Sequence, residues 1–409
     1  MTDPLAKSVE RVVRRGNCSG CGGCTLTSER IEMTMSSAGF LRPTVSPLKD
    51  GLARQSSRRQ AAEFKTMCPG VRVSAPSPLG ASDSIFGPHI SVWHGWAVDP
   101  AMRFEGSSGG VLTALTTWLI QTGQIEYSVA AAQGSPAANT TTAVRITSKE
   151  EALAAAGSRY GPVSNLCEYD PGTSRSALVG KPCEISAAAQ LEDSRSISAE
   201  ARPIKLSFFC AGTPSQNATN TLSESLGIPA DQATSLRYRG AGWPGDFSVS
   251  DASGKRASVS YDESWGKHLG HALQWRCKIC VDGTGGHADV SVGDYWKSDD
   301  AGYPIFDNED GRSVVIARTA RGDSLLRLAS TAGVLHLEPL DLGLVLPVQP
   351  LQVDRRMTLA YRLLGRAVVG KLPPHYRGFK LLRLAVPAYR RGPRVSLGTI
   401  IRSLEQDGQ

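Results

Sequence analysis

The chain has 409 residues, of which 41% are hydrophobic, and a formal net charge of +7. This length and composition predict two or three packed domains and exclude a globally disordered protein. The charged stretch from Met1 to Arg15 lacks the apolar core of a secretory signal, and no run of about 18 apolar residues occurs, so we expect neither secretion nor a membrane-spanning helix.

Cysteines near the N-terminus form the first motif along the chain. Cys18, Cys21 and Cys24 have the spacing Cys-x2-Cys-x2-Cys, and the dipeptide Cys68-Pro69 follows. We expect a cytoplasmic location, where clustered cysteines bind metal rather than form disulfides. Three close thiolates and a distant Cys-Pro are typical of a [4Fe–4S] cluster, so the motif predicts that these four cysteines hold one. A four-cysteine zinc site is the alternative.

An insertion of 43 residues separates Cys24 from Cys68. Its stretch Leu41–Arg59 is rich in Pro, Ser and Arg without clear periodicity, which predicts an irregular excursion. If the insertion folds separately, Cys68 does not reach the triplet, and the site then has three cysteines or another ligand. Residues 71–90 are rich in Pro, Gly and Ser and are predicted to be a linker.

An alternating pattern of strands and helices begins at Trp93. The glycine-rich turn Gly106–Gly110 opens an apolar helix, and Ser148 with Glu151 forms a capping box for a helix over 149–156. The predicted strands are Tyr127–Ala132, Ala143–Thr147, Ser176–Gly180, Ile204–Phe209, Asp289–Val292 and Ser313–Ala317, and a hairpin joins Phe247–Ser250 to Ala257–Tyr261.

The glycine-rich turn is a candidate ligand site. Free backbone N–H groups and the positive end of a helix favour an anion such as phosphate at such a turn. Other polar residues near element ends could contact the same ligand. The candidate cofactor-binding residues are Arg103, Ser107, Ser108, Gly109, Gly110, Ser158, Arg159, Tyr160 and Lys181. The alternative is a tight turn before a core helix, with the other side chains solvated.

Four more cysteines form a second, scattered group. Cys183 and Cys210 follow predicted strands, at the carboxyl ends where open α/β sheets gather ligands. Cys277 and Cys280 form a Cys-x2-Cys knuckle, and the four together predict a second [4Fe–4S] cluster.

A rival arrangement and one spare cysteine accompany this second group. His268 and His271 could join Cys277 and Cys280 in a compact zinc site that uses no distant ligand. Cys167 has no partner at useful spacing and is expected to be a small buried hydrophobe.

The C-terminal part of the chain is strongly basic. Eleven Lys or Arg and no Asp or Glu lie between Arg355 and Arg394. Arg362 and Arg366, mixed with Leu and Val, predict a cationic amphipathic helix for an anionic membrane or an acidic partner. Nucleic acid is disfavoured because no nucleic-acid motif occurs. A solvated basic surface that closes the domain is the alternative.

Several short blocks resemble the beta subunit family of coenzyme F420 hydrogenase/dehydrogenase, whose relatives include 7-hydroxymethyl chlorophyll a reductase. The blocks are Ser107-Ser-Gly-Gly-Val-Leu-Thr113, Gly180-Lys-Pro-Cys-Glu-Ile185, Phe209-Cys-Ala-Gly-Thr-Pro-Ser215, Arg239-Gly-Ala-Gly-Trp-Pro-Gly245, and Cys277-Lys-Ile-Cys280 through Asp289-Val-Ser-Val-Gly-Asp294. The resemblance covers residues 15–345. It implies an iron–sulfur flavoprotein with FAD and one or more [4Fe–4S] clusters, in which the turn 107–110 contacts FAD.

The predicted fold is α/β with a mixed sheet, divided into four parts. These are a ferredoxin-like [4Fe–4S] segment (1–85), an α/β flavin-binding domain (86–175), a domain with the second cluster (176–345) and a basic tail (346–409). The resemblance implies an oxidoreductase that moves electrons between clusters, FAD and an organic substrate or deazaflavin, with an electron donor such as ferredoxin.

Other interpretations stay open. One is an electron-relay subunit of a larger complex, and another is a zinc-stabilised binding module without enzymatic activity. Peripheral membrane attachment is an alternative to a purely cytoplasmic location. No general acid is evident, and His268, His271 and Tyr261 are the candidate proton donors. The substrate is not identified.

Overall fold

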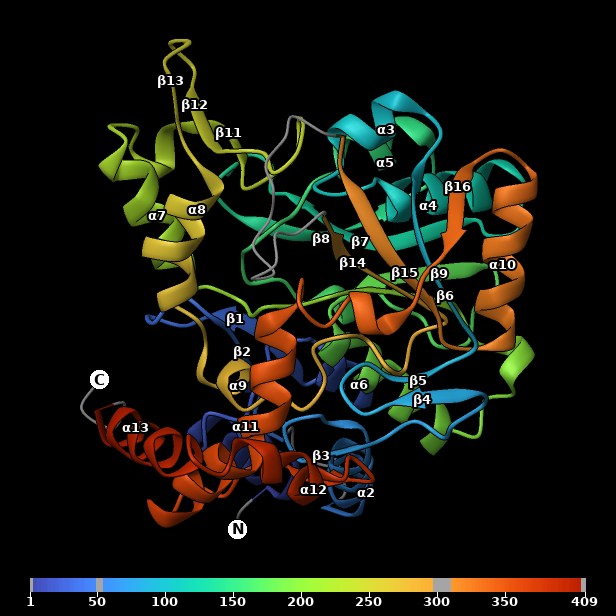
Figure 1. Ribbon diagram of the computed structural model, residues 1–409. Helices are drawn as coiled ribbons and strands as arrows, with labels where there is room; N and C mark the ends of the chain where they lie inside the picture. Colours follow the sequence, from blue (N-terminus) through green and yellow to red (C-terminus); the bar gives the residue numbers. More distant parts are fainter. Residues whose placement is uncertain (1–2, 49–53, 297–309, 406–409) are drawn as a thin grey trace.

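The computed structural model describes residues 3–48, 54–296 and 310–405 (Figure 1). An eight-stranded sheet forms its centre, with the strand order β16-β6-β15-β14-β10-β9-β7-β8. Its strands are β6 (Ser91–Ala97), β7 (Tyr127–Gln133), β8 (Thr141–Ile146), β9 (Ser176–Gly180), β10 (Ile204–Phe208), β14 (Val290–Tyr295), β15 (Arg312–Ala317) and β16 (Leu335–Pro339). The predicted α/β class with a mixed sheet is confirmed.

Four neighbouring strands, β7, β9, β10 and β14, run parallel, and the other four pair antiparallel beside them. Alternation along β9 explains the two helical layers. Ala177 faces the core under α4 (Val111–Gln121) and α10 (Ala320–Thr331), whereas Leu178 faces α6 (Pro182–Ser194). Helices therefore cover both faces of the parallel strands. A ligand can reach these strands at their ends.

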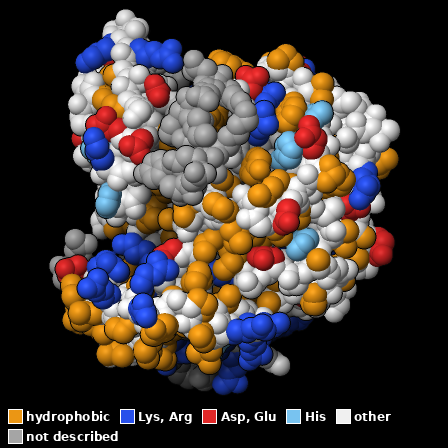
Figure 2. All heavy atoms as spheres, viewed as in Figure 1, with side chains coloured by type: hydrophobic (Ala, Val, Ile, Leu, Met, Phe, Trp, Pro, Cys, Tyr) orange, Lys and Arg blue, Asp and Glu red, His pale blue; other side chains and the backbone are white. Residues whose placement is uncertain are grey.

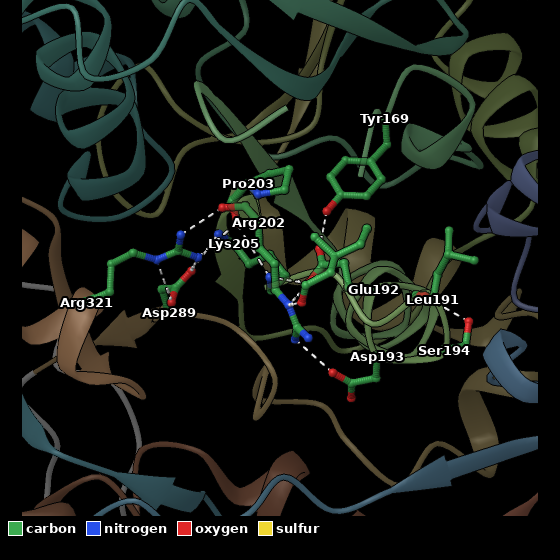
Figure 3. A network of polar contacts seen from close by, with 11 residues as sticks. Tyr169, Leu191, Glu192, Asp193, Ser194, Arg202, Pro203, Lys205, Asp289 and Arg321 are labelled. Carbon is green, nitrogen blue, oxygen red and sulfur yellow. Dashed lines mark hydrogen bonds and ion pairs between the residues drawn. The ribbon is translucent and has the colours of Figure 1, made fainter. Parts of the chain in front are cut away.

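The amino-terminal end of these strands is held by a buried network of charges (Figure 3). Glu192, near the end of α6, is fully buried, and Lys205 of β10 donates to it at 2.8 Å. The Tyr169 hydroxyl donates to the same carboxylate. Asp289, just before β14, pairs with Arg321 of α10 at 2.7 Å. The network ties helices to strand starts and leaves the carboxyl ends to the site.

The N-terminal segment differs from two predictions. Leu41–Arg59, predicted to be irregular, begins with β2 (Leu41–Val45) and ends within α2 (Arg54–Met67); residues 49–53 lie outside the described part. Strand β2 pairs antiparallel with β1 (Ile31–Met35), and its half-buried side chains hide the alternation.

The predicted linker 71–90 is also packed. It contains β3 (Arg72–Ser74) and the hairpin of β4 (Ala81–Asp83) with β5 (Gly87–His89). Phe86 is only 1% exposed and belongs to a core cluster beneath β15. The segment 71–90 is therefore part of the packed body, with Gly87 and Pro88 in a strand, and is not a free linker.

A smaller sheet stands beside the main one, with the order β11-β12-β13, and contains the predicted hairpin. Its strands are β11 (Ala233–Arg237), β12 (Phe247–Asp251) and β13 (Arg256–Val259). The remaining short helices are α1 (Pro4–Arg14), α3 (Pro100–Glu105), α5 (Lys149–Ala154), α7 (Gln216–Ser225), α8 (Tyr261–Glu263) and α9 (Trp275–Lys278).

The chain ends in helices α11 (Pro350–Val368), α12 (Leu381–Ala385) and α13 (Gly392–Glu405), and α11 packs on both others. Strand β17 (His375–Arg377) pairs parallel with β3. The cationic helix predicted around Arg366 is partly wrong, because Arg366 is fully buried, lies over the Trp275 ring and donates to the Arg15 carbonyl. Within the described ranges, no helix combines the length and apolar character needed to cross a bilayer.

Candidate cofactor cleft and cysteine groups

The first four cysteines surround one small cavity. Cys18 and Cys21 lie between α1 and the helical turn Gly23–Thr27, which contains Cys24, and Cys68 follows the last turn of α2. All four thiols line the cavity, together with apolar side chains such as Phe64 and Met67. The insertion thus folds back and returns Cys68 to the triplet.

Burial raises the pKa values of Cys21, Cys24 and Cys68 in this group. Burial, with a smaller contribution from the charge of Cys18, raises the pKa of Cys21 to about 11. Burial also raises the pKa values of Cys24 and Cys68, and neighbouring thiolates add to the effect. Four thiolates can share such a place when a cationic group offsets their charge, as a metal cluster does.

The second group gathers at the carboxyl ends of β9 and β10. Cys277 accepts a hydrogen bond from the Thr213 amide at 3.3 Å, and Cys280 donates to the Asp282 carbonyl at 3.0 Å. Burial, followed by the charge of Cys277, raises the pKa of Cys210 to about 12. The Cys210 loop and the Cys277–Cys280 knuckle are therefore neighbours.

Cys183 is within electrostatic reach of both groups. Burial raises its pKa most strongly, and the charges of both Cys21 and Cys210 act on it in the same direction. The Lys181 ammonium acts in the opposite direction. The segment after β9 thus places the Cys183 thiol where the charges of both cysteine groups act on it.

Two side chains from the α9 region connect the groups directly. The Gln274 amide donates to the Ser19 carbonyl at 2.9 Å, inside the N-terminal triplet. Arg276 donates to the Pro69 carbonyl at 3.3 Å and to the Ile279 carbonyl at 3.4 Å. The residue before Cys277 is therefore bonded to the residue after Cys68.

The α11 helix covers the second group from outside. Arg355 donates to the Cys210 carbonyl at 2.8 Å, and Gln352 donates to the same oxygen at 3.3 Å. The Arg356 guanidinium donates to the Val281 carbonyl. Part of the basic C-terminal segment therefore fixes the backbone that carries Cys210.

A cleft of about 460 Å³ opens at the carboxyl ends of the parallel strands. Its walls include the turn before α4, the 158–161 segment, the ends of β10 and β14, and the start of α11. Cys210 lies in its wall, so the cleft and the second cysteine group share a boundary. This is the edge where α/β sheets bind ligands.

Seven of the nine predicted cofactor-binding residues line this cleft. They are Ser107, Ser108, Gly110, Ser158, Arg159, Tyr160 and Lys181. In the described part of the chain, the lining does not include Gly109, whose amide donates to Ser313 Oγ at 3.0 Å, or Arg103, which donates to the Gly311 carbonyl at 3.0 Å.

Two of the lining cations are already engaged. Arg159 donates to the carbonyls of Thr140 and Leu236, and so joins the residue before β8 to β11. Lys181 Nζ donates to the Val163 carbonyl at 2.9 Å and pairs with Glu184 at 2.8 Å. Both side chains therefore hold the backbone of the wall in place and also give the wall positive charge.

Several lining residues were missed by the sequence analysis. Arg239 is buried, pairs with Asp294 at 2.6 Å and lies over the Tyr261 ring, and Trp243, Trp265 and Trp296 add aromatic surface. Both Arg239 and Asp294 lie in sequence blocks that resemble the family, and this resemblance could have identified them as site residues.

Two features of the wall suit a large flat ligand with polar edges. Asn165 Oδ1 and Trp296 Nε1 are buried without a hydrogen-bond partner among the described residues. A Cβ at Gly293 would lie 2.5 Å from the Phe209 ring, so only glycine permits this close wall. Unsatisfied polar atoms beside an aromatic lining are the usual chemistry of a cofactor pocket.

The candidate proton donors are separated. Tyr261 lines the cleft, and its pKa is raised chiefly by burial. His268 and His271 are absent from the described lining, and His271 Nε2 lies 2.9 Å from the Gly266 carbonyl.

Across residues 3–48, 54–296 and 310–405, no three His, Cys, Asp or Glu side chains are placed to hold a single metal ion.

The expectation for Cys167 is wrong. Its residue is exposed rather than buried, and it lies beside the first cysteine loop, where Thr25 donates to its sulfur at 3.9 Å. A Cβ at Gly22 would lie 2.8 Å from the Cys167 sulfur.

The fold is α/β, and Cys210 lies in the wall of the cleft at the carboxyl ends of its parallel strands. Profiles of the coenzyme F420 hydrogenase/dehydrogenase beta subunit match residues 92–168 with the N-terminal part and 173–342 with the C-terminal part. The chain belongs to this family, and the predicted resemblance is confirmed.

Two curated relatives are similar over most of their length. Coenzyme F420 hydrogenase subunit beta of Methanothermobacter thermautotrophicus is 25% identical over 267 residues, which are 63% of this chain and 87% of that protein. The subunit of Methanococcus voltae is 26% identical over 271 residues, 63% of this chain and 86% of its own.

One solved structure shows a similar fold. A chain of the xenon-derivatised F420-reducing [NiFe] hydrogenase complex from Methanosarcina barkeri matches 68% of this chain and 96% of its own length. Its TM-score is 0.50 and its identity is 20%, so the likeness concerns the fold alone. Helices α11–α13 follow residue 342, where the family match ends.

Proposed function

We propose that this chain is an iron–sulfur flavoprotein that exchanges electrons between two [4Fe–4S] clusters, FAD and an organic substrate or deazaflavin. The observation that supports this most is the shared wall, because Cys210 belongs both to the cleft and to the second cysteine group. A cofactor bound in the cleft would therefore lie beside the residue that helps to hold the second cluster.

The donor sets fit the two kinds of cofactor. Eight thiols stand in two groups, and thiolates are the preferred ligands of iron in iron–sulfur clusters. Cys18, Cys21, Cys24 and Cys68 would hold one cluster, and Cys183, Cys210, Cys277 and Cys280 the other. When bound, FAD supplies the conversion between two-electron and one-electron transfer.

The chain itself supplies position and exclusion of water. The turn before α4 offers backbone N–H groups and the positive end of an eleven-residue helix to the phosphates. Arg239 and Asp294 form a fixed charge pair at the cleft wall, and Tyr261 is the candidate proton donor that lines the cleft. Aromatic side chains of this wall offer stacking surface to a flat ring.

A second candidate is an electron-relay subunit that requires a partner. The relative of known structure is part of a hydrogenase complex, which favours this alternative. Ferredoxin or another redox protein would then deliver the electrons. Steady-state turnover of the isolated chain with an artificial electron donor separates the two candidates, because a relay subunit shows none.

The decisive experiment is cofactor analysis of oxygen-protected protein. We expect iron, acid-labile sulfide and FAD, and we expect Cys277→Ser to lose about half of the iron, because one missing thiolate destabilises only its own cluster. Cys167→Ser is the matched control and retains all the iron, since Cys167 belongs to neither group. Folded wild-type protein that contains zinc and no iron contradicts the proposal.

A further inference from the structure

Helix α13 has its apolar side turned outward. Thr399 and Ser403 are buried against α11, whereas Leu397, Ile401 and Leu404 are exposed. The exposed three follow the i, i+4, i+7 spacing of one helix face. A surface helix ordinarily buries such a stripe against its own protein, so we expect another molecule to cover this face.

The preceding turn extends the same kind of surface. Leu382 of α12 is 83% exposed, the highest value among the exposed large hydrophobic residues, and Val386 and Tyr389 are exposed after it. Figure 2 shows hydrophobic side chains gathered along the lower left, where Figure 1 draws α11, α12 and α13. Gathered apolar side chains, unlike single ones, mark interaction sites.

Cations surround this apolar surface. No Asp or Glu occurs from Arg355 to Leu404. The exposed basic residues of this segment are Arg377, Lys380, Arg383, Arg390, Arg391, Arg394 and Arg402. The combination of aliphatic groups, a tyrosine and many cations matches the interface of a bilayer with anionic headgroups.

We propose that α12 and α13 dock this protein on an anionic membrane surface, with their apolar side chains in the headgroup region and their cations on phosphates. A second copy of the chain would bring two cationic surfaces together and is disfavoured by repulsion. Carboxylates at this surface are few, namely Glu405 at the end of α13 and Asp354, which pairs with Arg391 at 2.9 Å, so the surface suits an anionic lipid layer better than a protein partner of mixed charge. It also lies beyond the family match, so it adds to the redox core and depends on none of its cofactors.

The test is co-sedimentation of the purified full-length protein with vesicles. We expect binding to vesicles that contain phosphatidylglycerol, little binding to pure phosphatidylcholine, and loss of binding at high salt because salt screens the attraction. Leu382→Ala is expected to weaken binding at least about tenfold, since the lost methyl and methylene groups no longer enter the lipid. Arg394→Ala is expected to weaken it about fivefold.

Matched controls lie elsewhere on the molecule. Leu328→Ala changes an exposed leucine of α10, and Arg256→Ala changes an exposed arginine of β13; both should bind vesicles as the wild type does. Circular dichroism verifies that each variant is folded. Absent binding by folded wild-type protein, equal binding to neutral and anionic vesicles, or equal effects of test and control variants each overturn the proposal and leave the face to a protein partner.

Discussion

Asp289 shows how one buried carboxylate is kept ionised. Burial acts to raise its pKa, but the Arg321 guanidinium at 2.7 Å and Lys205 together outweigh burial and hold the pKa below its ordinary value. A carboxyl whose folded pKa is depressed stabilises the fold above its unfolded pKa, and this contribution is lost as the pH falls through the folded pKa.

Asp289→Asn should therefore destabilise the protein most at neutral pH. We expect the difference in free energy of unfolding from wild type to be about 1–2 kcal/mol there, because the partly exposed Arg321 guanidinium loses its charged hydrogen-bond partner. The difference should shrink as the pH falls below about 4. Urea unfolding of both proteins over a pH series measures it. A difference that stays constant into acid contradicts the role assigned to the ion pair.

Single residues of the site differ in how well the sequence reveals them. Spacing singled out the N-terminal triplet and the Cys277–Cys280 knuckle, whereas Cys183 and Cys210 were chosen because they follow predicted strands. Arg239 and Asp294 escaped attention because they are 55 positions apart and form a pair only once β14 lies beside the β11–β12 region. Arg103 is the opposite case. The sequence made it a candidate cofactor-binding residue, but its side chain donates to the Gly311 carbonyl and is not part of the described cleft lining.

At the scale of elements, α11 and α13 approach closely where Gly365 faces the Ser396 carbonyl. A Cβ at Gly365 would lie 2.7 Å from that oxygen, which is backbone and does not yield easily. Gly398 of α13 is different, because an added Cβ meets only the end of the Arg402 side chain at 3.4 Å. The two glycines offer a matched pair of substitutions.

Gly365→Ala should lower the free energy of unfolding by about 1–3 kcal/mol, because it forces the helices apart. Gly398→Ala should raise it by about 0.5–1 kcal/mol, because alanine restricts the unfolded chain and favours helix. Thermal and chemical denaturation measure both. A stabilising Gly365→Ala would show that the contact between α11 and α13 is loose.

Local elements were largely predictable from caps and alternation. The helix after Ser148 and strand β9 appear where the sequence places them. The first turns of α2 were missed because their Arg, Gln and Ser residues carry no apolar stripe. The packing of α11 on the Cys210 loop could not be predicted either, because its contacts join residues more than 140 positions apart.

In the whole molecule, the two cysteine groups form one unit. Gln274 and Arg276 bond the knuckle to the N-terminal loop, and Cys183 lies within electrostatic reach of both groups. Clusters held in these groups would be close neighbours, so electrons could pass between them inside one chain.

We therefore expect the chemically reduced protein to give an electron paramagnetic resonance spectrum of two magnetically interacting clusters. Cys277→Ser should reduce it to the signal of one isolated cluster. If the wild-type spectrum is instead the plain sum of two independent signals, the two sites are farther apart than this geometry implies.

The bond from Gln274 to the Ser19 carbonyl also constrains how the protein is made. Its two ends are 255 residues apart, so the loop that starts the chain gains its final support only after the ribosome has produced most of the polypeptide. The four cysteines beside that loop all precede residue 69, so a cluster bound there early would lack only the outer support of Gln274. A product truncated before Gln274 should therefore hold such a cluster less firmly than the full chain does.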